Sequence, residues 1–280
     1  MKLMTLIDGS NYAASVCDHS AWIVDNTGAE VVLVHVLDHK AASKSADNLS
    51  GSIGLGARSE LLEELAELDT QNARLAQKVG RAILEDGKSR LTNAGVKVVS
   101  SQLRHGEIVE TVEDLEADLI VIGKRGESAD LNNLHLGTNL ERVVRSAHKP
   151  VLVASRSFKP IKSALVAFDG GNSVKLAIDY MVEYPAFNNI ECTLLAVNPQ
   201  GDTANQLEQV ANRLRSVGYA MTTQIESGQV ENVIVKAIEN NSHDLLIMGA
   251  YGHSRIRNLI IGSTTTEMVR ACQVPVLMFR

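Results

Sequence analysis

The sequence carries one pattern twice, and this internal repeat limits the fold more than any other feature of the chain. An apolar run that ends in glycine, Asp118–Gly123, recurs as Asp244–Gly249, and a further glycine follows each run after two residues. The two halves also start alike, at Leu6–Gly9 and Ala167–Gly170. A repeat of this length indicates the tandem duplication of a whole domain rather than a solenoid of short units.

Length and composition are those of a two-domain globular protein. The 280 residues and the repeat predict domains over residues 1–156 and 160–280, each long enough to bury its own core. A net charge of −6 without a basic block argues against nucleic acid as the partner. Asp8 interrupts the chain start too soon for a signal peptide, no apolar run approaches membrane-spanning length, and the three cysteines are scattered. We therefore expect a cytoplasmic protein whose cysteines are buried thiols.

Continuous apolar runs alternate with stretches of helical periodicity in both halves. Strands are predicted at 3–7, 30–37, 96–103, 119–122 and 151–154, and again at 163–168, 192–197, 221–226, 245–248 and 276–279. Helices are predicted at 13–26, 59–93, 107–116 and 140–147, and again at 173–184, 203–217, 231–240 and 264–271. Unbroken apolar runs are typical of strands buried on both faces, and strands that alternate with helices predict a doubly wound α/β sheet.

The first half is longer than the second. Matching positions are 161 residues apart at Asp8 and Asp169 but 126 apart at Gly123 and Gly249, so the first half has 35 extra residues before its fourth strand. We assign most of them to a polar, mobile loop at 38–58 and to the long helix that follows it.

A glycine pattern, Gly249-x2-Gly252-x9-Gly262-Ser263, follows the fourth strand of the second half and leads into a helix. Glycines at a strand end let several backbone N–H groups approach an anion, and a helix N-terminus adds partial positive charge. The pattern therefore predicts phosphate binding. The hydroxyls of Ser263, Thr264 and Thr265 can bond the anion or cap the helix, and capping holds for at least one of them whatever the ligand.

Asp169 ends the first strand of the second half. Ligands of open α/β sheets lie beyond the carboxyl ends of strands at the topological switch point, which here places Asp169 opposite the glycine loop. Its carboxylate can accept hydrogen bonds from ribose hydroxyls or from an adenine amine, or it can cap the turn after its strand. The residues leave both interpretations open.

The glycine spacing, the start at Phe168–Gly170 and the close at Val274–Leu277 resemble the universal stress protein family, once per half and over essentially the whole chain. The resemblance implies a five-stranded parallel sheet of order 3-2-1-4-5 in each half, and a site for ATP with Mg²⁺ carried by the phosphates. In its terms Asp169 contacts adenosine, Val197 contacts adenine and Met248 contacts the nucleotide through its backbone. The resemblance also implies that the glycine loop and the following helix bind ribose and phosphates, at Gly249, Gly252, Gly262, Ser263 and Thr264.

Two histidines near these positions have simple interpretations. His253, next to Gly252, lies either against a phosphate or in solvent. His35, within a predicted strand, is expected to be a hydrogen-bonded core residue. No histidine or cysteine pair has metal-site spacing, and no catalytic residue is assigned.

The first half departs from the pattern. Ten residues, including Glu127 and Asp130, separate Gly126 from Gly137, and these carboxylates oppose a triphosphate unless a metal intervenes. Asn139 and Leu140 stand where the second half has Thr264 and Thr265. The candidates that remain are Asp8, Val36, Gly123, Gly126, Gly137 and Thr138. We expect either a weaker or altered nucleotide site here, or an empty site with a structural role.

Three functions fit these residues. The first is an ATP-binding stress-response regulator that holds adenine nucleotide chiefly in its second half and signals to an unknown protein partner. The second is a slow ATP hydrolase or self-phosphorylating enzyme with Ser263 or a neighbouring threonine as acceptor. It ranks lower, because the glycine loop of the second half has no lysine and no base for water is evident. The third is an interaction module that binds no nucleotide and keeps the glycine loops as architecture.

The duplication also predicts assembly within the chain. The fifth strands, Val151–Ala154 and Val276–Phe279, are expected to pair antiparallel, which covers two sheet edges and lets one chain mimic a dimer. Whether two chains associate further stays open. The apolar stripe over Leu61–Ile83 would suit a partner, with packing on its own sheet as the default expectation.

Overall fold

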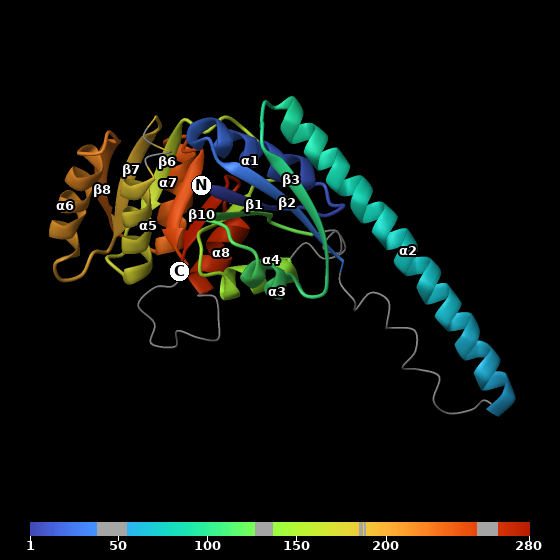
Figure 1. The fold of residues 1–280 in the computed structure, drawn as a ribbon. Coiled ribbons are helices and arrows are strands. Elements are labelled where there is room, and N and C mark those ends of the chain that lie inside the picture. Colours follow the sequence, from blue (N-terminus) through green and yellow to red (C-terminus); the bar gives the residue numbers. More distant parts are fainter. Residues whose placement is uncertain (38–54, 127–136, 185–186, 188, 251–262) are drawn as a thin grey trace.

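Each half of the chain folds around five parallel strands, and all ten strands join into one sheet (Figure 1). The computed structural model describes residues 1–37, 55–126, 137–184, 187, 189–250 and 263–280, and for residues 55–61 and 263–264 it describes the backbone only.

The elements follow the predicted order in both halves. The first half contains β1 Lys2–Leu6, α1 Ala13–Thr27, β2 Glu30–Leu37, α2 Leu55–Asn93, β3 Val99–His105, α3 Ile108–Asp114, β4 Leu119–Gly123, α4 Thr138–Ser146 and β5 Val151–Ala154. The second contains β6 Ser163–Ala167, α5 Asn172–Glu183, β7 Glu191–Val197, α6 Thr203–Arg215, β8 Ala220–Glu226, α7 Val230–Asn240, β9 Leu245–Gly249, α8 Ser263–Ala271 and β10 Val276–Phe279.

The strand order confirms the predicted topology. It reads β3-β2-β1-β4-β5 in the first half and β8-β7-β6-β9-β10 in the second, which is 3-2-1-4-5 each time. The halves meet where β5 and β10 pair antiparallel, with Leu152 opposite Leu277. This pairing within one chain was predicted, and it covers an edge of each half-sheet that would otherwise stay exposed.

Two apolar layers run across both halves. Buried side chains of α1, α2, α5 and α6 pack on one face of the sheet. Those of α3, α4, α7 and α8 pack on the other face. The cores are continuous through β5 and β10, so the ten-stranded sheet is packed as one body.

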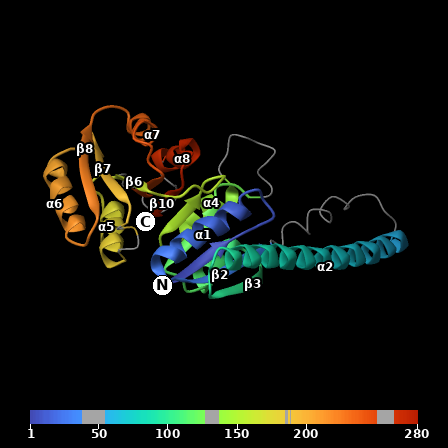
Figure 2. The same cartoon turned by 90° about the horizontal axis from the view of Figure 1, so that it is seen from above.

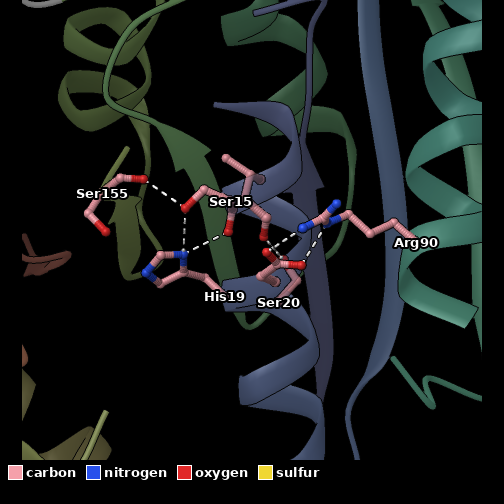
Figure 3. A network of polar contacts seen from close by, with 7 residues as sticks. Ser15, His19, Ser20, Arg90 and Ser155 are labelled. Carbon is pink, nitrogen blue, oxygen red and sulfur yellow. Dashed lines mark hydrogen bonds and ion pairs between the residues drawn. The ribbon is translucent and has the colours of Figure 1, made fainter. Parts of the chain in front are cut away.

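Side chains of α1 also contact the segment after β5 that connects the two halves (Figure 3). The Ser15 hydroxyl donates to the Ser155 carbonyl oxygen at 2.8 Å, and His19 Nδ1 donates to the Ser15 carbonyl at 2.7 Å. The His19 ring also meets Phe158 edge-on, with ring centroids 5.0 Å apart. Helix α1 of the first half is therefore fastened to the chain segment that leads into the second.

Helix α2 differs from its prediction in two respects. It begins at Leu55 rather than 59, so the end of the predicted 38–58 loop is helical, while 38–54 lies outside the described residues. Only its C-terminal half packs on the sheet, where a Cβ on Gly87 would come within 2.7 Å of Ile7 Cδ1. The N-terminal half projects away from the body (Figures 1 and 2). The expectation that the whole stripe packs on its own sheet is therefore wrong.

Strand β3 starts three residues later than the predicted 96, because the chain before it closes the preceding helix. The Val96 N–H donates to the Leu91 carbonyl oxygen at 3.0 Å, and Gly95 adopts a φ of +91°. This arrangement satisfies the last carbonyls of α2. Every other observed strand or helix boundary lies within two residues of its predicted position, apart from the start of α2.

Several local predictions hold. Gly28 ends α1 in the left-handed region, with a φ of +66°. His35 is buried and its Nδ1 donates to the Ile7 carbonyl oxygen at 2.8 Å. The three cysteines are buried free thiols, and burial raises the pKa of Cys17 to about 12. Among the helices described, none combines the length and the apolar character needed to cross a bilayer.

Candidate functional site

In each half the carboxyl ends of two central strands meet beside the start of a helix. Strands β1 and β4 are neighbours in the first half, and β6 and β9 are neighbours in the second. Asp8 and Asp169 follow the first strand of each pair, while Gly123 and Gly249 end the second. This edge is the topological switch point, where α/β sheets bind ligands.

The first half has a pocket at this edge. Four of its six predicted residues, Asp8, Val36, Gly123 and Gly126, line it together. Its cavity volume is about 60 Å³. Gly137 lies beside this loop, since a Cβ added to it would be 3.4 Å from the Gly126 nitrogen. Thr138 begins α4 with an exposed side chain and is not among the lining residues.

Other lining residues were not assigned from the sequence. They are mainly apolar or lie in the turns that frame the pocket, and include Tyr12, Ile108, Arg125, Asn139 and Leu140. Arg125 sits between the two glycines of its loop, so its position in the motif was a usable signal. Nothing in the local sequence marks Tyr12 or Ile108, because both reach the pocket only through helix packing.

The two strand-end glycines are required by packing. A Cβ on Gly123 would lie 2.8 Å from Tyr12 Cβ, and one on Gly249 would lie 2.9 Å from Ser173 Cβ. Neither contact involves the flexible end of a side chain, so the helix that starts above each strand would have to shift. Close packing of α1 and α5 therefore explains both glycines without reference to a ligand.

Gly126 has a different neighbour. A Cβ there would lie 2.8 Å from Asp8 Oδ2, so this glycine lets the loop after β4 touch the carboxylate after β1. A second link joins the same segments, because the Ser10 hydroxyl donates to the Arg125 carbonyl oxygen at 3.4 Å. Asp8 therefore faces the glycine loop of the first half, which is the arrangement predicted from the sequence for Asp169 in the second half.

Both aspartates also hold the turn that follows their strand. Asp8 Oδ1 accepts from the Ser10 N–H at 3.0 Å, and Asp169 Oδ1 accepts from the Gly171 N–H at 2.8 Å. This is the turn-capping role that the sequence left open. It occupies one oxygen of each carboxylate in the same way, which shows that the two halves are built alike at this point.

In the second half the described elements place Asp169, Gly249 and the start of α8 at one edge. Strands β6 and β9 are in register, with Ala167 beside Met248. Val197 ends the neighbouring strand β7 and is half-buried, whereas Met248 is buried. Gly252, His253 and Gly262 lie outside the described residues, and Ser263 and Thr264 are described only as the backbone of the first turn of α8.

Thr265 fixes the first turn of α8. Its buried hydroxyl donates to the Ala250 carbonyl oxygen at 2.7 Å. The contact holds the N-terminus of α8 next to the end of β9. It is not the helix capping that was expected of one of the three hydroxyls, because it donates to a carbonyl oxygen of the preceding strand end rather than accepting from a helix N–H. In the first half the corresponding residue is the buried Leu140, so this brace is replaced by apolar packing.

Lys124 corresponds to Ala250 and would be a natural ligand for phosphate, but it is used elsewhere. Its ammonium donates to the carbonyl oxygens of Arg270 and Cys272, both at 2.9 Å, at the C-terminus of α8. Burial lowers the pKa of Lys124, and the negative end of the helix dipole favours its charge. Lys124 therefore joins the two halves of the chain.

Replacing Lys124 by methionine is expected to lower the free energy of unfolding by about 1–2 kcal/mol, because two charge-assisted hydrogen bonds between the halves are lost. Urea denaturation of the purified chain measures the change. Lys149→Met is the control: Lys149 is exposed, and its replacement should change stability by less than about 0.5 kcal/mol. Equal effects of the two substitutions would contradict this role of Lys124.

The chain is similar to known proteins in sequence and in fold. The model of the universal stress protein family matches residues 1–155 and 198–280. Universal stress protein Slr1230 of Synechocystis sp. is 35% identical over 288 residues, covering 100% of this chain and 99% of the relative.

Solved structures share the fold over the full length. A universal stress protein from Archaeoglobus fulgidus superposes with a TM-score of 0.68 at 18% identity, covering 100% of this chain and 98% of that one. A putative universal stress protein from Pseudomonas aeruginosa gives 0.60 at 14% identity, covering 99% and 92%. From the family match in both halves and the full-length relative, we conclude that the chain belongs to the universal stress protein family and contains two of its domains in tandem.

Proposed function

We propose that this protein is an adenine-nucleotide-binding regulator of the stress response, with the nucleotide held chiefly by its second half, residues 160–280. The observation that carries the proposal is the convergence of Asp169, Gly249 and the N-terminus of α8 at one sheet edge. The first N–H groups of a helix have no partner within that helix and attract phosphate oxygens. Thr265 holds this helix start beside the strand end.

The chemistry of the residues fits the three parts of the ligand. Val197 provides an apolar surface for adenine, and Asp169 provides acceptor oxygens for ribose hydroxyls. The glycine loop from Gly249, with Gly252, Gly262 and Ser263, provides backbone N–H groups for phosphates. Mg²⁺ would enter with the nucleotide on its phosphates.

The first half is proposed as the weaker site. Its pocket has an acceptor in Asp8, an apolar wall in Val36 and a cation in Arg125, so a nucleotide is chemically acceptable there. Leu140 replaces the braced threonine of the second half, and Lys124 is bound to α8 of the other half. The first difference removes a polar group from the phosphate end, and Lys124, which stands where the second half has Ala250, supplies none there.

One set of observations favours the alternative of an interaction module without nucleotide. Gly123 and Gly249 are both explained by helix packing, and Asp8 and Asp169 both hold turns. In that case these glycines and aspartates serve folding alone. The two functions differ in whether ATP binds at all.

The test is binding of ATP with Mg²⁺ to the purified full-length chain, by calorimetry and by thermal unfolding. A ligand at a hundred times its Kd stabilises a protein by about 2.7 kcal/mol. Mass spectrometry of the small molecules released on denaturation shows whether nucleotide is already bound after purification. A chain that neither binds ATP nor releases nucleotide would exclude the proposed function and favour the interaction module.

Matched substitutions assign the site to one half. Asp169→Ala is expected to weaken ATP binding about tenfold or more, through loss of a charge-assisted hydrogen bond, whereas Asp8→Ala should change it less than about threefold. Asp169→Asn retains an oxygen for the Gly171 N–H and separates loss of the turn from loss of charge. The reverse ranking of Asp8→Ala and Asp169→Ala would place the principal site in the first half. A product assay on the same samples tests slow hydrolysis.

A further inference from the structure

The N-terminal half of α2 is a long amphipathic helix segment that the body of the protein does not cover. Leu68, Leu75 and Val79, which share one side of the helix, are 53%, 59% and 49% exposed. Both views show this segment projecting from the body (Figures 1 and 2). Large apolar side chains gathered on one exposed surface are characteristic of an interface.

This exposed stripe is not a continuation of the surface with which α2 packs on its own sheet. The packed surface consists of Gly80, Leu84, Gly87 and Leu91, which are all buried. The stripe of the half-buried Leu65 and the exposed Leu68, Leu75 and Val79 lies about 100° away around the helix axis. Even if the sheet reached further along α2, it would therefore contact the packed surface and leave the stripe in solvent. Burial of the stripe requires another partner.

The stripe has the spacing of a coiled coil. Leucines recur every seven residues, at 61, 68 and 75. Four residues after each of these leucines lie Leu65, Asn72 and Val79. Alternating steps of four and three residues keep one seam of a helix facing another helix. About three heptads are present, which is the length at which such pairing becomes effective.

Charge along this segment is segregated by sign. Glu63, Glu64, Glu67 and Asp69 precede the midpoint without an intervening lysine or arginine. Arg74, Lys78 and Arg81 follow it before the next acidic residue. A parallel pair would set acidic against acidic and basic against basic, whereas an antiparallel pair sets each acidic block against a basic one.

We propose that the N-terminal half of α2 pairs antiparallel with the same segment of a second copy of this chain. The heptads align Leu65 with the partner's Leu75, and the flanking positions then align Glu64 with the partner's Lys78. In this register Val79 lies opposite position 61 of the other chain. The overlap therefore ends where α2 begins to pack on its own sheet at Gly80, so it uses only the free part of the helix.

The first test is the mass of the full-length chain in solution, by light scattering and sedimentation over a concentration series. The chain should have twice its mass of 30.2 kDa. Leu68→Glu with Leu75→Glu should return it to the monomer by raising the dissociation constant of the dimer about a hundredfold or more. Both side chains are exposed, so the thermal unfolding of the body should stay unchanged. A monomeric wild type, or a dimer that survives the double substitution, would overturn the proposal.

Charge exchange tests the orientation. Glu64→Lys or Lys78→Glu alone should weaken the dimer about tenfold, because each change creates two like-charge contacts, and the two together should restore it. In a parallel pair Glu64 would lie beside the partner's Asp69, so Glu64→Lys would strengthen association. Strengthening by this single change would overturn the antiparallel arrangement.

Disulfide formation gives an independent measure. A mixture of Leu65→Cys and Leu75→Cys chains should form a cross-linked heterodimer, while Leu65→Cys alone should not, since its two copies would be about 15 Å apart along the axis. The three native cysteines are buried and do not compete. A parallel pair, which would also set Asn72 against the partner's Asn72, predicts rapid cross-linking of Leu65→Cys alone. That result would overturn the proposed orientation.

Discussion

Lowering the pH from 7.5 to 5.5 is expected to reduce the free energy of unfolding of this protein by about 2 kcal/mol, chiefly through His19 and His243. Both are buried, and burial lowers the pKa of each, against the opposing effects of the Ser15 carbonyl and Asp18 on His19 and of Asp244 on His243. His19 Nδ1 already donates to the Ser15 carbonyl, so protonation would place a charge on Nε2, which has no hydrogen-bond partner among the described residues.

The direction follows from the two protonation equilibria. In the unfolded chain a histidine binds a proton near pH 6.5, while in the folded chain these two bind it only at lower pH. Below pH 6.5 the unfolded state therefore holds more protons, and stability falls as pH falls. Each histidine can contribute up to about 1.4 kcal/mol per pH unit.

Urea denaturation at a series of pH values measures this loss. His19→Gln keeps an N–H that can reach the Ser15 carbonyl but does not titrate, so it should remove about half of the pH dependence. His148→Gln is the control, because His148 is exposed and should leave the profile unchanged. A His19→Gln profile as steep as that of the wild type would show that His19 does not titrate in this way.

Replacing Gly249 by alanine is expected to lower the free energy of unfolding by about 2 kcal/mol, since the added Cβ would stand 2.9 Å from Ser173 Cβ and 3.3 Å from the Val174 nitrogen. Gly249 does not have a positive φ, so the cost comes from packing rather than from backbone strain. Gly123→Ala should behave alike in the first half, where Tyr12 Cβ is 2.8 Å away.

A double-mutant cycle identifies the contact. Ser173→Gly removes the atom nearest to the new methyl group, so the double substitution should be at least about 1 kcal/mol more stable than the sum of the single effects predicts. Additive effects would mean that the clash with Ser173 is not the cause. ATP titration of Gly249→Ala adds a functional result: lost stability with unchanged affinity would favour the interaction module over the nucleotide regulator.

Much of the fold could be predicted because its signals are local and repeated. Strands β2, β5 and β10 have their predicted limits, since an unbroken apolar run bounded by polar residues leaves little choice. The antiparallel pairing of β5 with β10 was also predictable, because two equivalent edges in one chain can cover each other. Strand β3 was misplaced at its start because Val96, apolar like a strand residue, instead closes the end of α2.

The site was predictable only in outline. A strand that ends in Asp or Gly marks the sheet edge, so Asp8, Gly123 and Gly126 were expected together, and they line one pocket. Spacing could not reveal that Gly123 is needed for Tyr12, or that Lys124 reaches the end of α8 in the other half. Those contacts join residues far apart in sequence, and local patterns carry no information about them.

The sequence by itself determined the duplication, the order of strands and helices, and the sheet edge at which Asp8, Gly123, Asp169 and Gly249 lie, because periodicity and repetition are properties of the chain. Only the tertiary structure decided which side of α2 is buried and which is free. The sheet reaches the segment of α2 that contains Gly80, Leu84, Gly87 and Leu91, so these residues are buried, whereas Leu62, Leu68 and Leu75 before them are exposed. Gly80 and Gly87 permit this close approach, since a Cβ on either would lie 2.7 Å from a side-chain carbon of Leu103 or Ile7.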